Sequence, residues 1–161
     1  EIENDKNKTL QFLDSFSNIY RYILDNTDSI TSILKNELTF VDHYMEVCMT
    51  NYSENSIFLK TDVPIEVLNY SIPKLSLQML VENALKHNKH TDENPLVIEI
   101  GVDSKNAHIY VKNNLQPKKV HHSTQSGLQN INDRFKLMGL EEIIIENNSQ
   151  EFIVYLPFIK T

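Results

Sequence analysis

A polar face near the middle of the sequence carries side chains suited to a phosphorylated ligand. Asn83, Lys86 and His87 recur at helical spacing, and Glu82 adjoins them. Positions three and four residues apart share one side of a helix, so a helix here would bring these groups together. An amide oxygen flanked by cations suits a phosphate that carries Mg²⁺, because Mg²⁺ retains several waters and needs few protein oxygens. The periodicity alone favours a simpler interpretation, a solvated face on a helix whose other side is buried.

Other metal and redox chemistry finds less support in the residue types. His87 and His90 are spaced like a pair of zinc ligands, but the sequence offers no evident third ligand. Cys48 is the single cysteine, which excludes an internal disulfide and any multi-cysteine zinc site. Such cysteine usage fits a reducing cytoplasm.

The helix that must position the polar face is predicted over residues 75–89, with Pro73 before it and apolar residues at helical spacing on its other side. Strands are expected at 57–63, 96–102, 107–113, 143–146 and 152–158, and a further helix at 127–138. This order predicts an α+β fold, a two-layer α/β sandwich with a mixed sheet and helices on one face. No G-x-G-x-x-G follows a strand, which argues against a doubly wound dinucleotide-binding domain.

Two helices are predicted before the first strand, each with an apolar stripe. The stripes consist of Leu10, Leu13, Phe16, Tyr20 and Ile23 in the first helix, and of Leu34, Leu38, Val41, Met45, Cys48 and Tyr52 in the second. The heptad-like spacing of the second stripe suits packing against another helix. Two interpretations stay open, a helical hairpin that closes on its own domain and part of a dimer bundle. We expect a helical region at 1–54 and a second domain at 55–161.

Composition limits the class of protein. The 161 residues are 40% hydrophobic and 23% charged, which is typical of a folded chain rather than a disordered tail. A net charge of −7 argues against non-specific nucleic-acid binding, and no apolar run is long enough to span a membrane. Only three glycines are present, whereas average usage predicts about eleven.

The helix at 75–89 contains a motif with a specific resemblance. Residues 81–87, Val-Glu-Asn-Ala-Leu-Lys-His, resemble the N box of bacterial sensor histidine kinases, whose ATP-binding domain has the GHKL fold. The stretch 72–78 that leads into this motif, and Tyr20-Arg21-Tyr22 in the first helix, are similar to the LytS subfamily. Residues 113–118 and 126–131 stand in the positions of the two glycine boxes of the family.

The resemblance implies a site for ATP and Mg²⁺. Asn83 matches the magnesium-binding asparagine, and Asn113 stands where most members have the aspartate that accepts a hydrogen bond from the adenine amino group. Glu82 matches the acid of the subfamily, to which we assign no role as a general base. The implied cofactor-binding residues are Glu82, Asn83, Lys86, His87, Asn113, Asn114, Lys118, Gly127 and Leu128.

Both glycine boxes depart from the family pattern. Leu115 and Pro117 occupy the two glycine positions of the first box, and only Gly127 survives in the second, where Ser123 and Gln125 replace glycines. A glycine lets backbone approach a nucleotide closely, which leucine and proline do not allow. The segment between the boxes would be a lid over ATP, and its basic residues are Lys118, Lys119, His121 and His122.

The phosphoacceptor motif of the family, Pro-His-Phe-Leu-Phe-Asn, is absent, and His43 lacks its surroundings. We therefore expect a piece of a sensor kinase that begins just after the phosphoacceptor and does not autophosphorylate on its own. The resemblance implies transfer of the ATP γ-phosphoryl to an upstream histidine, a response regulator as partner, and a homodimer in the full-length protein. It also implies the cytoplasmic portion of a membrane sensor.

Two other functions stay open. The rewritten glycine boxes motivate a degenerate GHKL scaffold that binds ATP weakly or not at all and signals through protein contacts. The second open function is a GHKL ATPase outside signalling, or an anti-sigma kinase. The helix that contains Tyr20-Arg21-Tyr22 argues against this function.

Overall fold

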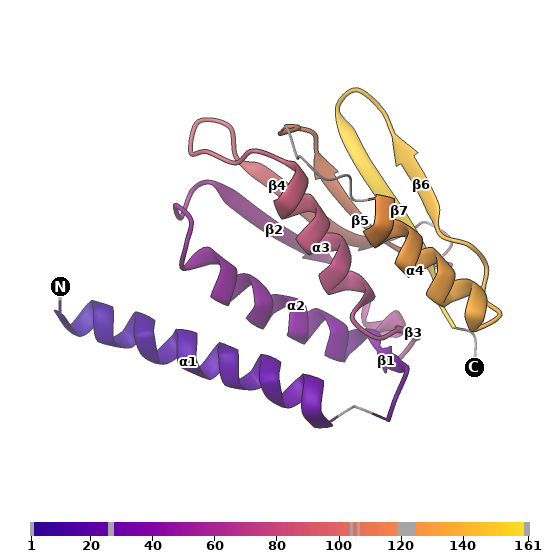
Figure 1. The fold of residues 1–161 in the computed structure, drawn as a ribbon, viewed down its shortest axis with the longest axis horizontal. Helices are drawn as coiled ribbons and strands as arrows, with labels where there is room; N and C mark the ends of the chain where they lie inside the picture. Colours follow the sequence, from indigo (N-terminus) through magenta and orange to yellow (C-terminus); the bar gives the residue numbers. More distant parts are fainter. Residues whose placement is uncertain (1, 26–27, 104, 106, 119–124, 160–161) are drawn as a thin grey trace.

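A mixed five-stranded sheet forms one layer of the protein (Figure 1). The computed structural model describes all residues except 1, 26–27, 104, 106, 119–124 and 160–161. The strands, in their order across the sheet, are β2 (Ile57–Asp62), β4 (Leu96–Val102), β5 (His108–Asn114), β7 (Glu151–Pro157) and β6 (Ile144–Asn147). β2 pairs with β4 in parallel and the other neighbours are antiparallel. The predicted strands are confirmed to within a residue or two at their ends.

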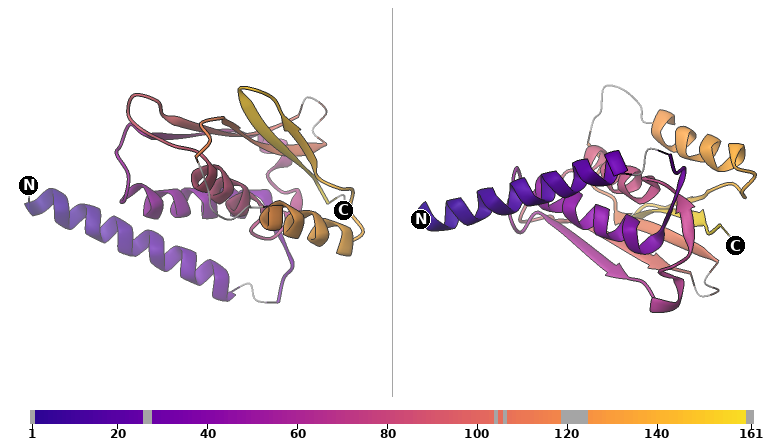
Figure 2. Two further views of the ribbon diagram at one scale, coloured as in Figure 1. Left: turned by 45° about the horizontal axis from the view of Figure 1, so that its top comes forward. Right: turned by 90° about the horizontal axis from the view of Figure 1, so that it is seen from below.

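Three helices cover one face of this sheet, as the two views of Figure 2 show. They are α2 (Leu34–Met49), α3 (Ser76–His87) and α4 (Gln125–Leu137). α1 (Ile2–Asp25) lies against the outer side of α2, away from the sheet. The α+β sandwich predicted from the sequence is confirmed, with helices on one face. None of the helices in the described part of the chain is long and apolar enough to cross a membrane.

The core lies between the sheet and the helical layer. α3 buries the apolar face expected from its spacing, and the alternating residues of the central strands meet it. The residues concerned are Leu77, Leu80, Val81, Ala84 and Leu85 of α3 with Ile98, Ile100, Ile109, Val111, Val154 and Leu156 of the sheet. Because β5 alternates, Asn113 points to the same side as Ile109 and Val111, and thus toward the helices.

The two N-terminal helices differ in what their apolar stripes contact. Leu34, Val41 and Met45 of α2 belong to the same buried core as the sheet. The α2 stripe therefore closes on its own chain, the first of the two interpretations above. The α1 stripe remains in contact with solvent, and its members Leu13 and Phe16 are each 52% exposed. The predicted boundary between 54 and 55 stays a prediction.

A buried carboxylate ties α1, α2 and the start of α3 together. Glu37 of α2 is 1% exposed and accepts hydrogen bonds from the Tyr22 hydroxyl at 2.7 Å and from the Leu75 backbone N–H at 2.9 Å. Leu75 has φ of 65°, a left-handed conformation that is costly for leucine. Burial raises the pKa of Glu37. Glu37 thus stabilises the strained entry into α3, the helix that carries the predicted polar face.

Two smaller features were not predicted. β1 (Thr31–Ile33) and β3 (Ser71–Pro73) pair in a separate two-stranded sheet, and a 3₁₀ turn spans Ile65–Val67. α4 begins two residues before its predicted start and ends at Leu137, one residue before its predicted end. Gly139, which follows the helix, has a φ of 70° that suits glycine.

Candidate functional site

A cavity of about 310 Å³ opens between α3, the central strands and the start of α4. This volume lies at the lower end of the range for small-molecule sites, which is roughly 300–1,000 Å³. The lining residues are Leu80, Asn83, Ala84, His87, Asn88, Val111, Asn113, Leu115, Pro117, Lys118, Leu128, Phe152 and Val154. The floor is apolar, because it is the end of the core, and the polar groups gather along α3 and β5.

α3 sends only part of its polar face into the cavity. Asn83 and His87 line it, one helical turn apart. Glu82 and Lys86 are exposed and lie outside the lining. Glu82 accepts a hydrogen bond from the Gln78 side chain at 2.8 Å, along the outer surface of α3.

Gly127 lies directly against the amide of Asn83. A Cβ at position 127 would come within 3.3 Å of Asn83 Oδ1 and 3.5 Å of its Nδ2. The 3.3 Å approach is tighter than ordinary van der Waals contact, so a side chain at position 127 would require the Asn83 amide to shift by a few tenths of an ångström. Leu128, the next residue, lines the cavity.

The two adjacent asparagines of β5 have different surroundings. Asn113 is 4% exposed and lines the cavity, and its Nδ2 donates to the Asn114 carbonyl at 2.8 Å. No described residue donates to Asn113 Oδ1, so this oxygen is the acceptor that the side chain offers to a ligand. Asn114 lies outside the lining, because its amide bonds the backbone of Val97 and Pro95 at the start of β4.

The segment after β5 forms one wall of the cavity through Leu115, Pro117 and Lys118. Leu115 and Pro117 thus fill the places of the two replaced glycines with apolar surface. Lys118 donates from its backbone N–H to the His87 carbonyl at 3.0 Å and from Nζ to the Leu85 carbonyl at 3.3 Å. The lysine ammonium is therefore held at the C-terminal end of α3, where the helix dipole favours a cation.

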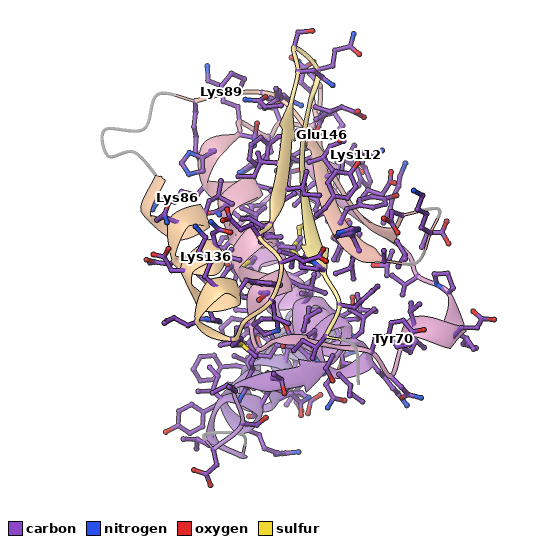
Figure 3. The ribbon with its side chains drawn as sticks, turned by 90° about the vertical axis from the view of Figure 1, so that its right-hand side faces the viewer. Tyr70, Lys86, Lys89, Lys112, Lys136 and Glu146 are labelled. Atoms are coloured by element: carbon purple, nitrogen blue, oxygen red, sulfur yellow. The ribbon has the colours of Figure 1, made fainter. Side chains whose placement is uncertain are left out.

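The site is electrostatically suited to an anion. Burial lowers the pKa of His87, and the charges of Lys86 and Lys118 lower it further. An anion placed among these groups would relieve their mutual repulsion. In Figure 3, Lys86 and Lys89 lie on the same side of the molecule as α4, whereas Lys112 and Glu146 lie on the sheet.

Among the described residues, no three His, Cys, Asp or Glu side chains are placed to hold a metal ion. His90, the second half of the zinc-like pair, instead packs against the Tyr52 ring at 4.5 Å between centroids. A metal in the cavity would depend on an asparagine amide oxygen, such as that of Asn83, and on oxygens of the ligand itself. Such a donor set fits Mg²⁺ carried by a phosphate.

The structure thus brings together Asn83, His87, Asn113, Lys118 and Leu128 around one cavity, with Gly127 against Asn83. It does not bring Glu82, Lys86 or Asn114 to the lining. Lys119, His121, His122 and Ser123 lie outside the described residues. The sequence reasoning missed Asn88 and the apolar lining of Leu80, Ala84, Val111, Phe152 and Val154. The alternation along β7 could have indicated Phe152 and Val154, because both lie on the inward side of this strand.

Comparison with known proteins agrees with this fold. Residues 1–56 match the model of the family described as histidine kinase. An uncharacterized sensor-like histidine kinase of Staphylococcus epidermidis is 31% identical over 117 residues, which cover 71% of this chain and 22% of that protein. The sensor protein kinase HptS of Staphylococcus aureus is 31% identical over 98 residues, or 61% of this chain and 18% of HptS.

Solved structures of histidine kinases share the fold. The histidine kinase AdeS of Acinetobacter baumannii superposes with a TM-score of 0.50 at 10% identity, over 92% of this chain and 77% of that chain. The catalytic domain of the histidine kinase ThkA superposes with a TM-score of 0.50 at 16% identity, over 79% and 94% of the two chains. The chain belongs to the histidine kinase family and has the GHKL fold of its catalytic domains. It spans about a fifth of the length of the curated relatives it matches.

Proposed function

We propose that this chain is the ATP-binding catalytic region of a LytS-type sensor histidine kinase. The observation that carries the proposal is the convergence of Asn83 and Asn113 on one cavity, from two elements distant in sequence. Asn113 offers a free acceptor for the adenine amino group, and Asn83 offers an amide oxygen for Mg²⁺. The apolar floor between them suits the flat face of a purine.

The role of the chain's own residues is positioning and charge neutralisation. When bound, ATP supplies the γ-phosphoryl group that the kinase transfers to a histidine. Lys118 and His87 would hold the phosphates, and the cations at the end of α3 would compensate their charge. Phosphoryl transfer depends mainly on such positioning and electrostatics, so this region needs no nucleophile of its own.

The remaining parts of the proposal concern the full-length protein. The acceptor histidine would lie upstream, a response regulator would receive the phosphoryl group, and this region would be the cytoplasmic portion of a membrane sensor. The solvent-exposed apolar stripe of α1 supports a homodimer, because a stripe of large apolar side chains is suited to a helix of a second copy.

Isothermal titration of the 161-residue chain with Mg-ATP tests nucleotide binding. We expect saturable heat in the wild type, and its loss in Asn83→Ala. Asn132→Ala is the matched control, since Asn132 on α4 bonds residues 142–143 and lies outside the cavity. Absence of heat at millimolar Mg-ATP would overturn the proposal in favour of the degenerate scaffold, which the apolar wall of Leu115 and Pro117 would then explain.

A further inference from the structure

The C-terminal end of α3 is fastened to the cavity wall by a buried side chain that the sequence did not single out. Asn88, the first residue after α3, is 3% exposed. Its Nδ2 donates to the Ala84 carbonyl at 2.9 Å, and its Oδ1 accepts from the Gln116 backbone N–H at 2.8 Å. Each end of the amide thus has a partner of the correct type, which also defines its orientation.

The contacts around Asn88 join two separate segments into one unit. Asn88 and Pro117 form an antiparallel β-bridge, and the Lys89 N–H donates to the Gln116 carbonyl at 2.7 Å. On the other side of Pro117, the Lys118 N–H donates to the His87 carbonyl. The Gln116 side chain continues the connection to the Pro95 carbonyl at 2.8 Å.

These contacts also satisfy the end of the helix. The last carbonyls of an α-helix have no partner within the helix. In α3, Asn88 Nδ2 takes the Ala84 carbonyl, Lys118 Nζ the Leu85 carbonyl, and the Lys118 N–H the His87 carbonyl. The same hydrogen bonds that end the helix therefore set the position of the Lys118 ammonium beside the cavity.

We propose that Asn88 is a positioning residue of the nucleotide site, which holds the 115–118 segment so that the Lys118 ammonium meets the phosphates. This inference rests on the proposed ATP binding. Asn88 acts through the 115–118 segment and does not contact the adenine. Its loss should therefore weaken binding of the triphosphate more than binding of adenosine.

The test compares affinities for Mg-ATP and for adenosine in Asn88→Ala, Lys118→Ala and the double variant. Hydrogen bonds to charged groups are strong enough that we expect each single variant to lose about tenfold for Mg-ATP and less than about threefold for adenosine. Because Asn88 acts through Lys118, the double variant should lose no more than Lys118→Ala alone. Asn132→Ala serves again as the control, with destabilisation but unchanged affinities.

Equal losses for both ligands, or additive losses in the double variant, would overturn the role of Asn88. If the wild type bound no Mg-ATP, the proposed function itself would fail, which is a separate result. If Asn88→Ala does not fold, amide hydrogen exchange of the wild type tests the role of Asn88 instead. Mg-ATP should slow exchange at the Gln116 and Lys118 amides, because a ligand stabilises the arrangement that binds it. Binding with unchanged exchange at these two amides would contradict the proposal.

Discussion

Gly127→Ala should separate the stability of the protein from its affinity for Mg-ATP. Residue 127 lies in the first turn of α4, where alanine is favoured over glycine by up to about 1 kcal/mol. For a chain of this size, such a gain corresponds to a rise in melting temperature of roughly 2–4 °C. The variant should therefore be as stable as the wild type or slightly more stable.

Nucleotide binding should change in the opposite direction. The new Cβ would lie 3.3 Å from Asn83 Oδ1, so the amide must move by a few tenths of an ångström. Mg²⁺ demands ligand oxygens at about 2.0–2.1 Å in near-octahedral geometry, and a tolerance of about 0.2 Å is the usual limit. Changes to groups that orient a metal ligand typically reduce metal affinity by roughly 10–100-fold. We expect a loss of that order for Mg-ATP.

The assay combines thermal unfolding with calorimetric titration of Mg-ATP, and Gln129→Ala serves as the control because Gln129 is exposed in the next turn of α4. Titration with ATP in EDTA should show a smaller difference between wild type and Gly127→Ala, since the displaced group is the proposed metal ligand. Unchanged Mg-ATP affinity in Gly127→Ala would refute the reasoning. A marked fall in melting temperature would also contradict it, because the contact would then displace α4 and not the Asn83 amide.

Three further predictions concern titration and association. Burial and the neighbouring lysines lower the pKa of His87 below its ordinary 6.5, and bound phosphates would raise it. Mg-ATP affinity should therefore increase as the pH falls through 6.5 and below, and a pH series with His87→Gln should lack this component. The pKa of Glu37 is raised above 4.5, so above this pH the folded state retains a proton that the unfolded state has lost. The free energy of unfolding should therefore fall as the pH rises above 4.5. Denaturation curves of Glu37→Gln should show a smaller fall. Sedimentation should reveal concentration-dependent association of the chain. Phe16→Lys should reduce this association without a change in melting temperature, since Phe16 is exposed. An unchanged association constant in this variant would contradict a dimer through α1.

The periodic parts of the structure could be predicted from the sequence, and the parts that depend on distant partners could not. The α3 face and the alternation of β5 follow from side-chain spacing, and they place Asn83, His87 and Asn113 toward the cavity. The same spacing groups Lys86 with Asn83 and His87, but Lys86 lies outside the lining. Glu37 resembles a surface residue of an amphipathic helix, because its partners Tyr22 and Leu75 lie far from it in the sequence. Burial of such a group is decided by tertiary structure.

The same limit applies within the site. Asn88 follows the N-box motif without any local signal, and its role depends on Gln116, 28 residues away. Asn113 and Asn114 are indistinguishable by type and adjacent in sequence. The pleat of β5 sends one toward the cavity and leaves the other bonded to β4.

The central claim is that ATP occupies the cavity between α3 and β5, with its metal on Asn83. A crystal structure of the chain with Mg²⁺ and a non-hydrolysable ATP analogue tests this claim most directly. The account predicts the adenine amino group within hydrogen-bonding distance of Asn113 Oδ1, Mg²⁺ coordinated by Asn83 Oδ1, and the phosphates beside Lys118. A nucleotide bound elsewhere, or a metal held without Asn83, would contradict it.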